Sequence, residues 1–97
     1  MTMAIANALE KTDISQDRNR VVAVGLADDG GTLRAYCEVS EDDGGTTDEG
    51  PTAIAAADDV TPSVQILTTG EIIATIVASG LVTTYMSGDW GRTWAAV

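Results

Sequence analysis

Two eight-residue stretches decide the fold of this chain: SEDDGGTT at residues 40–47 and SGDWGRTW at residues 87–94. Serine, aspartate, glycine and threonine recur in them at the same spacing, about 47 residues apart. The shared residues are Ser40, Asp42, Gly44 and Thr46 in the first stretch, and Ser87, Asp89, Gly91 and Thr93 in the second. A set of turn residues that recurs at this period predicts a repeat architecture.

Short runs rich in β-branched residues surround the two stretches, and glycine, aspartate and threonine separate the runs. Alternating apolar and polar residues between such turn signals predict strands rather than helices. The predicted strands are Val21 to Leu26, Thr32 to Val39, Thr52 to Ala57, Ser63 to Leu67, Glu71 to Val77 and Leu81 to Met86. Residues 3–9 are ambiguous, because their alanines also permit a helix. The fold class is therefore all-β, built from short antiparallel strands.

The repeat extends upstream of each stretch. Residues 20–24 correspond to residues 71–75, and residues 31–36 to the region 80–85, so each copy has a strand, a glycine-containing hairpin and a second strand before the motif. A period of 40 to 50 residues with about four strands is typical of the blades of a β-propeller.

The two stretches resemble the Asp-box, or bacterial neuraminidase repeat, of sialidase-like β-propellers, whose pattern is Ser-x-Asp-x-Gly-x-Thr-Trp. The second copy matches every defined position through Trp94, whereas the first has Thr47 where tryptophan is expected. The resemblance covers nearly the whole chain, and it implies two four-stranded propeller blades.

The motif residues suit a turn rather than a reaction. Gly44 and Gly91 can adopt positive φ angles, and Asp42 and Asp89 can accept hydrogen bonds from backbone N–H groups within the turn. Hydroxyl groups close the turn, at Ser40, Ser87, Thr46 and Thr93. Trp94 is expected to fold under its hairpin and fill the space between neighbouring sheets. Thr47 predicts a looser first hairpin, or one whose gap another side chain fills.

The sialidase active site is not carried over with the motif. The family's chemistry uses three arginines that grip a carboxylate, a tyrosine nucleophile activated by a glutamate, and an aspartic acid. The chain offers Arg18, Arg20, Arg34 and Arg92. Tyr36 or Tyr85 could pair with Glu38 or Glu71, but core or rim positions are the simpler interpretation. We expect no catalytic residues and no enzyme.

The chain ends suggest how blades could be completed. We divide the chain into residues 1–12, an outer strand donated to a neighbouring blade, residues 13–59, the first blade, and residues 60–97, a second blade that lacks its outer strand. Residues 2–8 resemble residues 51–57, the expected outer strand of the first blade. Strand addition between copies would join three chains into a six-bladed ring. The alternative is that the chain is a fragment of a longer propeller.

Fifteen acidic residues against five basic ones give a formal net charge of -10. Such a chain lacks the cationic patch that binding to nucleic acid or an anionic membrane requires. Solubility is the simpler explanation of the acidity, and a cation site is the alternative. The candidate ligands are Asp28, Asp29, Asp42, Asp43, Asp48, Glu49, Asp58 and Asp59, and none shows calcium-loop spacing. We predict no cofactor and no metal.

Cys37 is the only cysteine and histidine is absent, which removes internal disulfides and the usual general base. We expect Cys37 to be an inert core thiol. We find neither a transmembrane run nor a secretory signal in the sequence. The localisation is left unknown, with a virion or an extracellular particle suspected.

Three functions remain open. The first is a ring-forming structural module, a homotrimer that contacts other particle proteins or glycans. The second is a lectin-like module that binds sugar through Trp90, Tyr85 or Tyr36. The third is a fragment of a sialidase-like glycoside hydrolase. Because Trp90 occupies a variable position at a hairpin tip, we expect its indole to face solvent as a ligand or partner contact, and Trp90→Ala to leave the fold intact.

Overall fold

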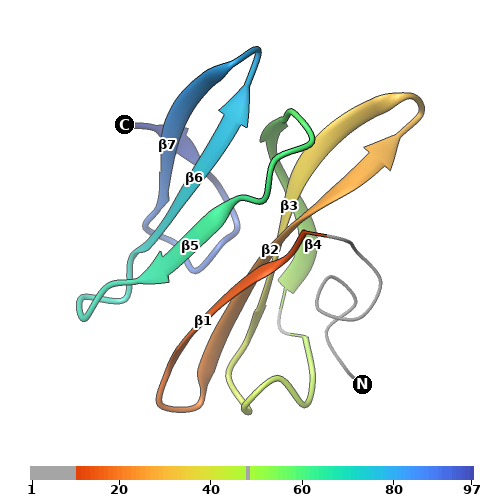
Figure 1. Cartoon of the computed structure of the whole chain (residues 1–97). Coiled ribbons are helices and arrows are strands. Elements are labelled where there is room, and N and C mark those ends of the chain that lie inside the picture. The colour runs from red at the N-terminus through yellow and green to blue at the C-terminus, as the bar shows by residue number, and fades with distance from the viewer. Residues whose placement is uncertain (1–10, 48) are drawn as a thin grey trace.

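The computed structural model describes residues 11–47 and 49–97, which form two four-stranded antiparallel sheets (Figure 1). Sheet A has the strand order β1-β2-β3-β4 and sheet B the order β5-β6-β7-β8. The strand bounds are β1 Asp13–Asp17, β2 Arg20–Asp29, β3 Thr32–Ser40, β4 Glu49–Ala56, β5 Ser63–Ile66, β6 Ile72–Ala78, β7 Leu81–Ser87 and β8 Ala95–Ala96. Because the described residues contain strands and no helix, the predicted all-β fold class is confirmed.

The central hairpin of each sheet is closed by a two-residue turn. Gly30 and Gly31 join β2 to β3 with φ angles of 63° and 93°, and Ser79 and Gly80 join β6 to β7 with φ angles of 52° and 75°. Two consecutive positive φ angles give a turn whose twist matches that of the flanking strands. The two hairpins therefore follow from their Gly-Gly and Ser-Gly turns.

Two strands were not among the sequence predictions. β1 has a single apolar residue, Ile14, so it carries no clear alternation of apolar and polar residues. β8 is two alanines long and pairs with β7 only at Tyr85 and Met86. The predicted donated strand within residues 1–12 lies almost entirely outside the described residues.

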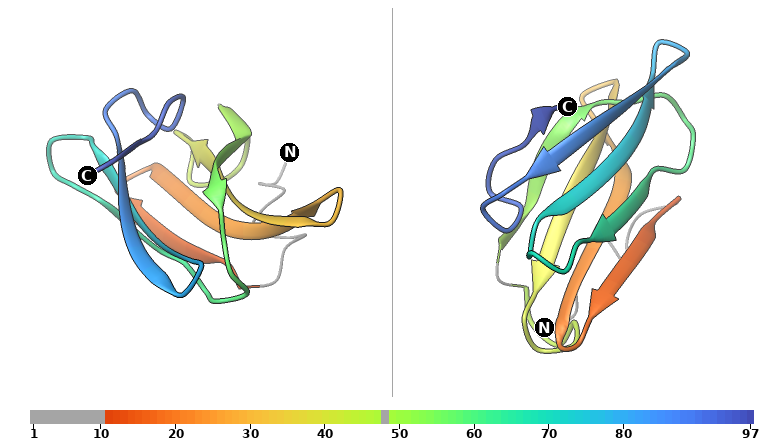
Figure 2. Two further views of the ribbon diagram at one scale, coloured as in Figure 1. Left: turned by 90° about the horizontal axis from the view of Figure 1, so that it is seen from above. Right: turned by 90° about the vertical axis from the view of Figure 1, so that its left-hand side faces the viewer.

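The two sheets pack against each other through one face each, which we call their inner faces. The inner face of sheet A carries Val22, Val24, Leu26, Ala35, Cys37 and Val39, and that of sheet B carries Val64, Ile66, Ile72, Ala74 and Ile76. Burying this apolar area is the main stabilising contribution to the fold. β1 and β5 lie side by side at the junction (Figures 1 and 2).

Side chains of β1 bind the free backbone edge of β5. The backbone N–H of Val64 donates to Oδ2 of Asp13 at 2.9 Å, and that of Ile66 donates to Oγ of Ser15 at 3.1 Å. Edge N–H groups that would otherwise lack a partner are thus satisfied across the junction.

The strand registers show which residues of the two sheets are equivalent. Ser40, which opens the first motif, pairs with Val21, and Ser87, which opens the second, pairs with Ile72. Val21 is therefore equivalent to Ile72, and Val22 to Ile73. Since Val22 lies on the inner face of sheet A and Ile73 on the outer face of sheet B, the two sheets stack front to back.

Candidate functional site

The first motif forms a tight turn between β3 and β4, closed by Ser40 and Asp42. The Ser40 hydroxyl donates to Oδ1 of Asp42 at 2.7 Å and accepts from the N–H of Gly44 at 3.0 Å. Asp42 also accepts from the N–H of Thr46 at 2.8 Å and from its hydroxyl at 2.5 Å. The motif side chains thus bind the backbone and hydroxyl groups of their own turn. We call residues 40–47 the first motif turn.

The second motif turn, residues 87–94, repeats this set of bonds between β7 and β8. The Ser87 hydroxyl donates to Oδ1 of Asp89 at 2.9 Å and accepts from the N–H of Gly91 at 2.8 Å. Asp89 accepts from the N–H of Thr93 at 2.9 Å and from its hydroxyl at 2.6 Å. Two segments far apart in the sequence therefore use the same donors and acceptors.

Backbone angles and carboxylate acidity also agree between the motif turns. The φ angles are 60° at Asp43 and 85° at Gly44, against 58° at Trp90 and 86° at Gly91. Hydrogen bonds from Thr46, and then from Ser40, lower the pKa of Asp42 to about 2, and those from Thr93 lower the pKa of Asp89 to about 2. Donors that favour the charged form keep both carboxylates ionised.

The motif turns differ in what they lie against. Gly91 is buried, and a Cβ at this position would lie 3.1 Å from Cγ1 of Val39 and 3.2 Å from Sγ of Cys37, whereas Gly44 is half-exposed. Trp94 packs on the core between the sheets and its Nε1 donates to the carbonyl of Gly91 at 3.2 Å. At the position equivalent to Trp94, the Thr47 hydroxyl donates to Oε2 of the buried Glu38 at 3.3 Å.

Trp90 does not face solvent as expected, and that prediction is wrong. Its ring is half-buried and packs against the core between the sheets. The Cζ atom of Arg20 lies 4.0 Å from the centre of the Trp90 ring, a cation–π contact between sheet A and the second motif turn. Nε1 of Trp90 and Nε of Arg20 are buried without a hydrogen-bond partner. The guanidinium of Arg20 thus covers part of the Trp90 ring.

Of the residues considered for sialidase chemistry, Tyr36 and Glu38 lie at alternate positions of β3 and share the outer face of sheet A, whereas Tyr85 and Glu71 lie elsewhere. Tyr85 packs on the inter-sheet core, and Tyr36 lies on the opposite face of sheet A beside Val21 and Ala23. Glu71 accepts from the Thr69 hydroxyl in the loop between β5 and β6.

Three of the four arginines lie near one end of the molecule, because Arg18 precedes Arg20 by two residues and Arg20 contacts Trp90, two residues before Arg92. Arg20 pairs with Asp17 at one end of sheet A, and Arg34 pairs with Ala27 near the other end. Arg18 is exposed between β1 and β2, and Arg92 is exposed in the second motif turn.

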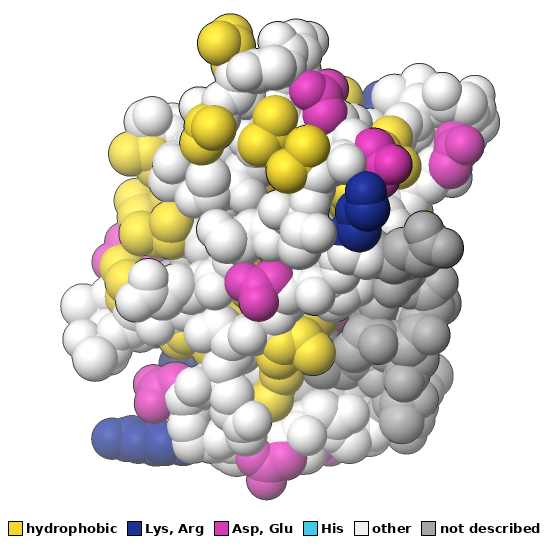
Figure 3. Space-filling view, viewed as in Figure 1, with side chains coloured by type: hydrophobic (Ala, Val, Ile, Leu, Met, Phe, Trp, Pro, Cys, Tyr) yellow, Lys and Arg dark blue, Asp and Glu magenta, His cyan; other side chains and the backbone are white. Residues whose placement is uncertain are grey.

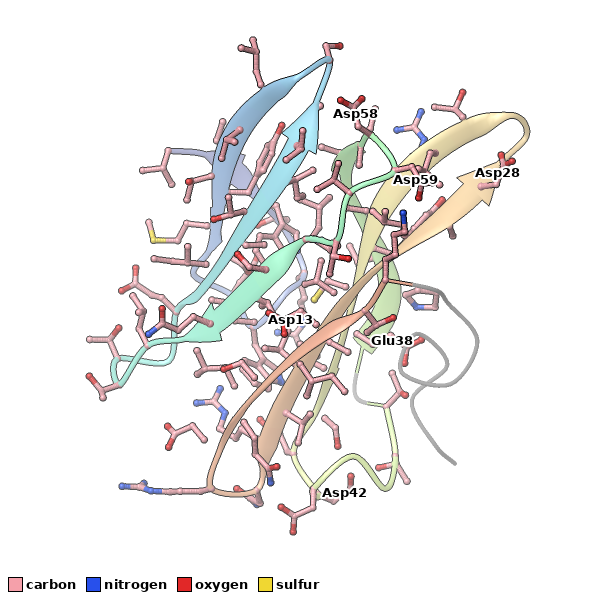
Figure 4. The ribbon with its side chains drawn as sticks, in the orientation of Figure 1. Asp13, Asp28, Glu38, Asp42, Asp58 and Asp59 are labelled. Carbon is pink, nitrogen blue, oxygen red and sulfur yellow. The ribbon has the colours of Figure 1, made fainter. Side chains whose placement is uncertain are left out.

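Several of the acidic residues considered as cation ligands accept hydrogen bonds from loop backbone or form an ion pair (Figure 4). Asp58 accepts from the N–H groups of Ser79 and Gly80 at 3.0 and 2.8 Å, and Asp28 accepts from the N–H of Gly31 at 2.8 Å. Asp59 forms an ion pair with Lys11 at 2.9 Å. Asp48 lies outside the described residues. Within the described part of the chain, no group of three or more acidic, cysteine or histidine side chains is placed to hold a metal ion.

Cys37 is buried on the inner face of sheet A. Burial, and then the neighbouring Glu38 carboxylate, raise the pKa of this thiol to about 12. A thiol with so little thiolate at neutral pH is a poor nucleophile. Cys37 therefore acts in packing.

The outer face of sheet B is a surface that the sequence analysis did not single out. Alternation along the strands places Ile73, Thr75, Val77, Val82, Thr84 and Met86 on this face. β5, β6, β7 and β8 contain no charged residue, in a chain in which 21% of residues are charged. Apolar side chains follow this side of the molecule in Figure 3, and no described segment covers it in the right-hand view of Figure 2. The uncharged strands were the sequence signal for this surface.

Among residues 11–47 and 49–97 we find no helix of the length and apolar character needed to cross a membrane. Comparisons of the chain with protein-family models, with curated proteins and with solved structures return no match.

Proposed function

We propose that the chain is a non-catalytic module that assembles with copies of itself into a β-propeller ring, and that the ring is a structural component of a larger particle. The observation that carries the proposal is the front-to-back stacking of two equivalent sheets, the second of which has an uncovered, uncharged outer face. When sheets stack front to back, each further copy can be added through the same kind of inter-sheet contact. If each contact includes a rotation, the stacked sheets close into a ring.

The short outer strand of sheet B supports the same proposal. β4 spans Glu49–Ala56, whereas β8 spans only Ala95–Ala96, so no described strand lies beside residues 81–83 on the edge of β7 that faces away from β6. An open edge of this kind accepts an added strand. Residues 2–8 resemble residues 51–57, which include most of β4, and in our proposal they supply that strand to a neighbouring copy. Three chains of two sheets each then complete six blades.

The absence of catalytic activity is part of the proposal. It is supported by the hydrogen bonds that Asp42 and Asp89 accept inside their own turns. Trp90 was the residue that most favoured the lectin-like alternative. Its contact with Arg20 leaves less of the ring open to a sugar, which supports the structural role over sugar binding.

Sedimentation velocity of the whole chain tests the proposal, with sialoside hydrolysis and a glycan array as companion measurements. We expect a species of three times the 10.0 kDa chain mass, no turnover of a fluorogenic sialoside and no glycan bound by the ring itself. A folded monomer at micromolar concentration overturns the assembly. Sialoside turnover that is lost with Tyr36→Phe or Tyr85→Phe, or a specific hit on the array, overturns the purely structural role.

A further inference from the structure

We infer that the outer face of sheet B is the docking surface for the outer face of sheet A of a second copy, in an interface that repeats the contact between the two sheets of one chain. This inference rests on the proposed ring assembly and specifies which faces and which atoms meet. The partner is a second copy of this chain.

The equivalence of the strands identifies the docking face. Going outward from the pair Val21 and Ile72, each buried residue of the inner face of sheet A has an equivalent on the outer face of sheet B. The equivalent pairs are Val22 and Ile73, Val24 and Thr75, Leu26 and Val77, Ala35 and Val82, Cys37 and Thr84, and Val39 and Met86. All six are buried in sheet A, and all six are at least partly exposed in sheet B.

The composition of this face argues that it is covered in the functional state. A solvated face of an antiparallel sheet is normally polar, and it carries charges. This face instead presents Ile73, Val77, Val82 and Met86 with two threonines, and Val82 is 70% exposed. Since the whole chain has a net charge of -10, copies repel one another at long range, and an uncharged face is where two copies can approach most closely.

The sizes of the side chains along β2 favour the outer face of sheet A as the occupant. Three residues of the docking face are larger than their equivalents in sheet A, since Ile73 replaces Val22, Val82 replaces Ala35 and Met86 replaces Val39, whereas Val77 is smaller than Leu26. On the outer face of sheet A, the β2 residues Val21 and Gly25 are smaller than their equivalents Ile72 and Ile76, whereas Tyr36 on β3 is larger than its equivalent Thr83. Larger residues meeting smaller ones keep the packed volume similar. Two outer faces of sheet B would instead bring the larger residues together.

In the proposed interface, the hydrogen bonds between β1 side chains and the β5 backbone are repeated by β5 side chains and the β1 backbone of the second copy. Within the chain, Asp13 and Ser15 accept from the backbone N–H groups of Val64 and Ile66. Their equivalents are Ser63 and Gln65, which are both exposed on the docking face. The interface therefore pairs Oγ of Ser63 and Oε1 of Gln65 with the backbone N–H groups of Ile14 and Gln16 in the second copy.

The exposed residue of β1 supports this arrangement. Ile14 is equivalent to Val64, which is 9% exposed at the junction within the chain, whereas Ile14 is 51% exposed. Val21 and Ala23 on the same face are already buried in the single chain, next to Tyr36. Among these residues we expect Ile14 to lose the most exposed area on assembly.

Adjacent residues of β7 provide a matched test. Val82 and Leu81 are 70% and 69% exposed, and they point to opposite faces of sheet B. We expect Val82→Asp to weaken assembly at least about tenfold in sedimentation equilibrium, as for a charge placed in an apolar interface, and Leu81→Asp to leave it near that of the wild type. Circular dichroism checks the fold, and Val82→Ser is the milder variant if Val82→Asp does not fold.

Mixing two variants identifies the face on the second copy. Ile14→Asp and Val82→Asp each damage one of the two surfaces, so each alone fails to assemble, but a mixture forms a species of two chains through the remaining intact pair. If Ile14→Asp alone assembles like the wild type, the second copy does not dock through sheet A and the inference is wrong. If wild type and Val82→Asp assemble equally, the docking face is wrong while the ring proposal stands. A monomeric wild type overturns the ring proposal itself.

Discussion

The two motif turns have the same hydrogen bonds and nearly the same φ angles, yet the central glycine is buried in the second turn and half-exposed in the first. The second turn lies on sheet A, with Gly91 buried against Val39 and Cys37. In the first turn the equivalent glycine, Gly44, is half-exposed. In the proposed ring, the first turn lies over Met86 and Thr84 of another copy, because these are the equivalents of Val39 and Cys37. The comparison teaches that the motif residues determine the conformation of the turn, whereas the packing of the turn on a neighbouring sheet determines how much it contributes to the free energy of unfolding.

The largest expected difference between the motif turns is at their last position. Trp94→Ala should lower the free energy of unfolding by about 3 kcal/mol, the lower end for a large aromatic because Trp94 is only partly buried. Thr47→Ala should cost about 1 kcal/mol or less, the loss of a single hydrogen bond to Glu38. Urea unfolding at one fixed protein concentration measures both, and equal losses would contradict the different packing of the two turns.

The next difference concerns Trp90 and its equivalent Asp43. Trp90→Ala should cost about 2 kcal/mol, because the half-buried ring and its contact with Arg20 are lost. Trp90→Phe should stay within about 1 kcal/mol of the wild type, because it keeps an aromatic ring and removes the unpaired Nε1 donor. Asp43→Ala, in an exposed position, is the control. If Trp90→Ala unfolds at the same temperature as the wild type, the indole contributes nothing to stability, and the solvent-facing orientation expected from the sequence would be the correct one.

A smaller difference is expected between the two turn glycines. Gly44→Ala and Gly91→Ala both place a side chain at a positive φ, which costs roughly 1–2 kcal/mol. Gly91→Ala should cost about 1 kcal/mol more, because its Cβ must also displace Val39 and Cys37. Chemical denaturation of the two variants under the same conditions gives the difference. A greater loss for Gly44→Ala would mean that the first turn is the more tightly packed one.

The smallest effect is the one that the motif turns share. Asp42 and Asp89 have pKa values of about 2 in the folded chain, below those of an unfolded aspartate. Their contribution to stability is therefore complete above the unfolded value and is lost as the pH falls toward 2. It is small because both carboxylates are solvent-exposed and screened.

Thermal unfolding between pH 5 and pH 2 measures this contribution. Asp42→Asn and Asp89→Asn should each flatten the acid limb of the profile by a similar amount. A flattening by only one of them would show that the equal geometry of the turns does not give equal electrostatics.

The sequence predicted the parts of the fold that local chemistry determines. The motif spacing and the Gly-Gly and Ser-Gly pairs indicated the hairpins, and the β-branched runs indicated most strands. β1 was missed because Asp13 and Ser15 on it serve as acceptors for β5, a tertiary role with no periodic signal. The orientation expected for Trp90 was wrong because its indole contacts Arg20 and the core, tertiary contacts that a variable position in a motif does not reveal. The uncharged strands within residues 63–87 were visible in the sequence, but recognising the outer face of sheet B as the equivalent of the inner face of sheet A required the strand registers of both sheets.

Photo-crosslinking from position 65 tests most directly whether sheet B binds sheet A of a second copy in the same way as sheet A binds sheet B within one chain. A benzophenone side chain in place of Gln65 sits on the rim of the docking face, where the parent residue is exposed. We predict a product of two chains whose captured peptide contains residues 13–17 of the partner copy. A captured peptide from residues 63–97 of a second copy, or the absence of any product between chains at concentrations where the protein is assembled, would contradict the account.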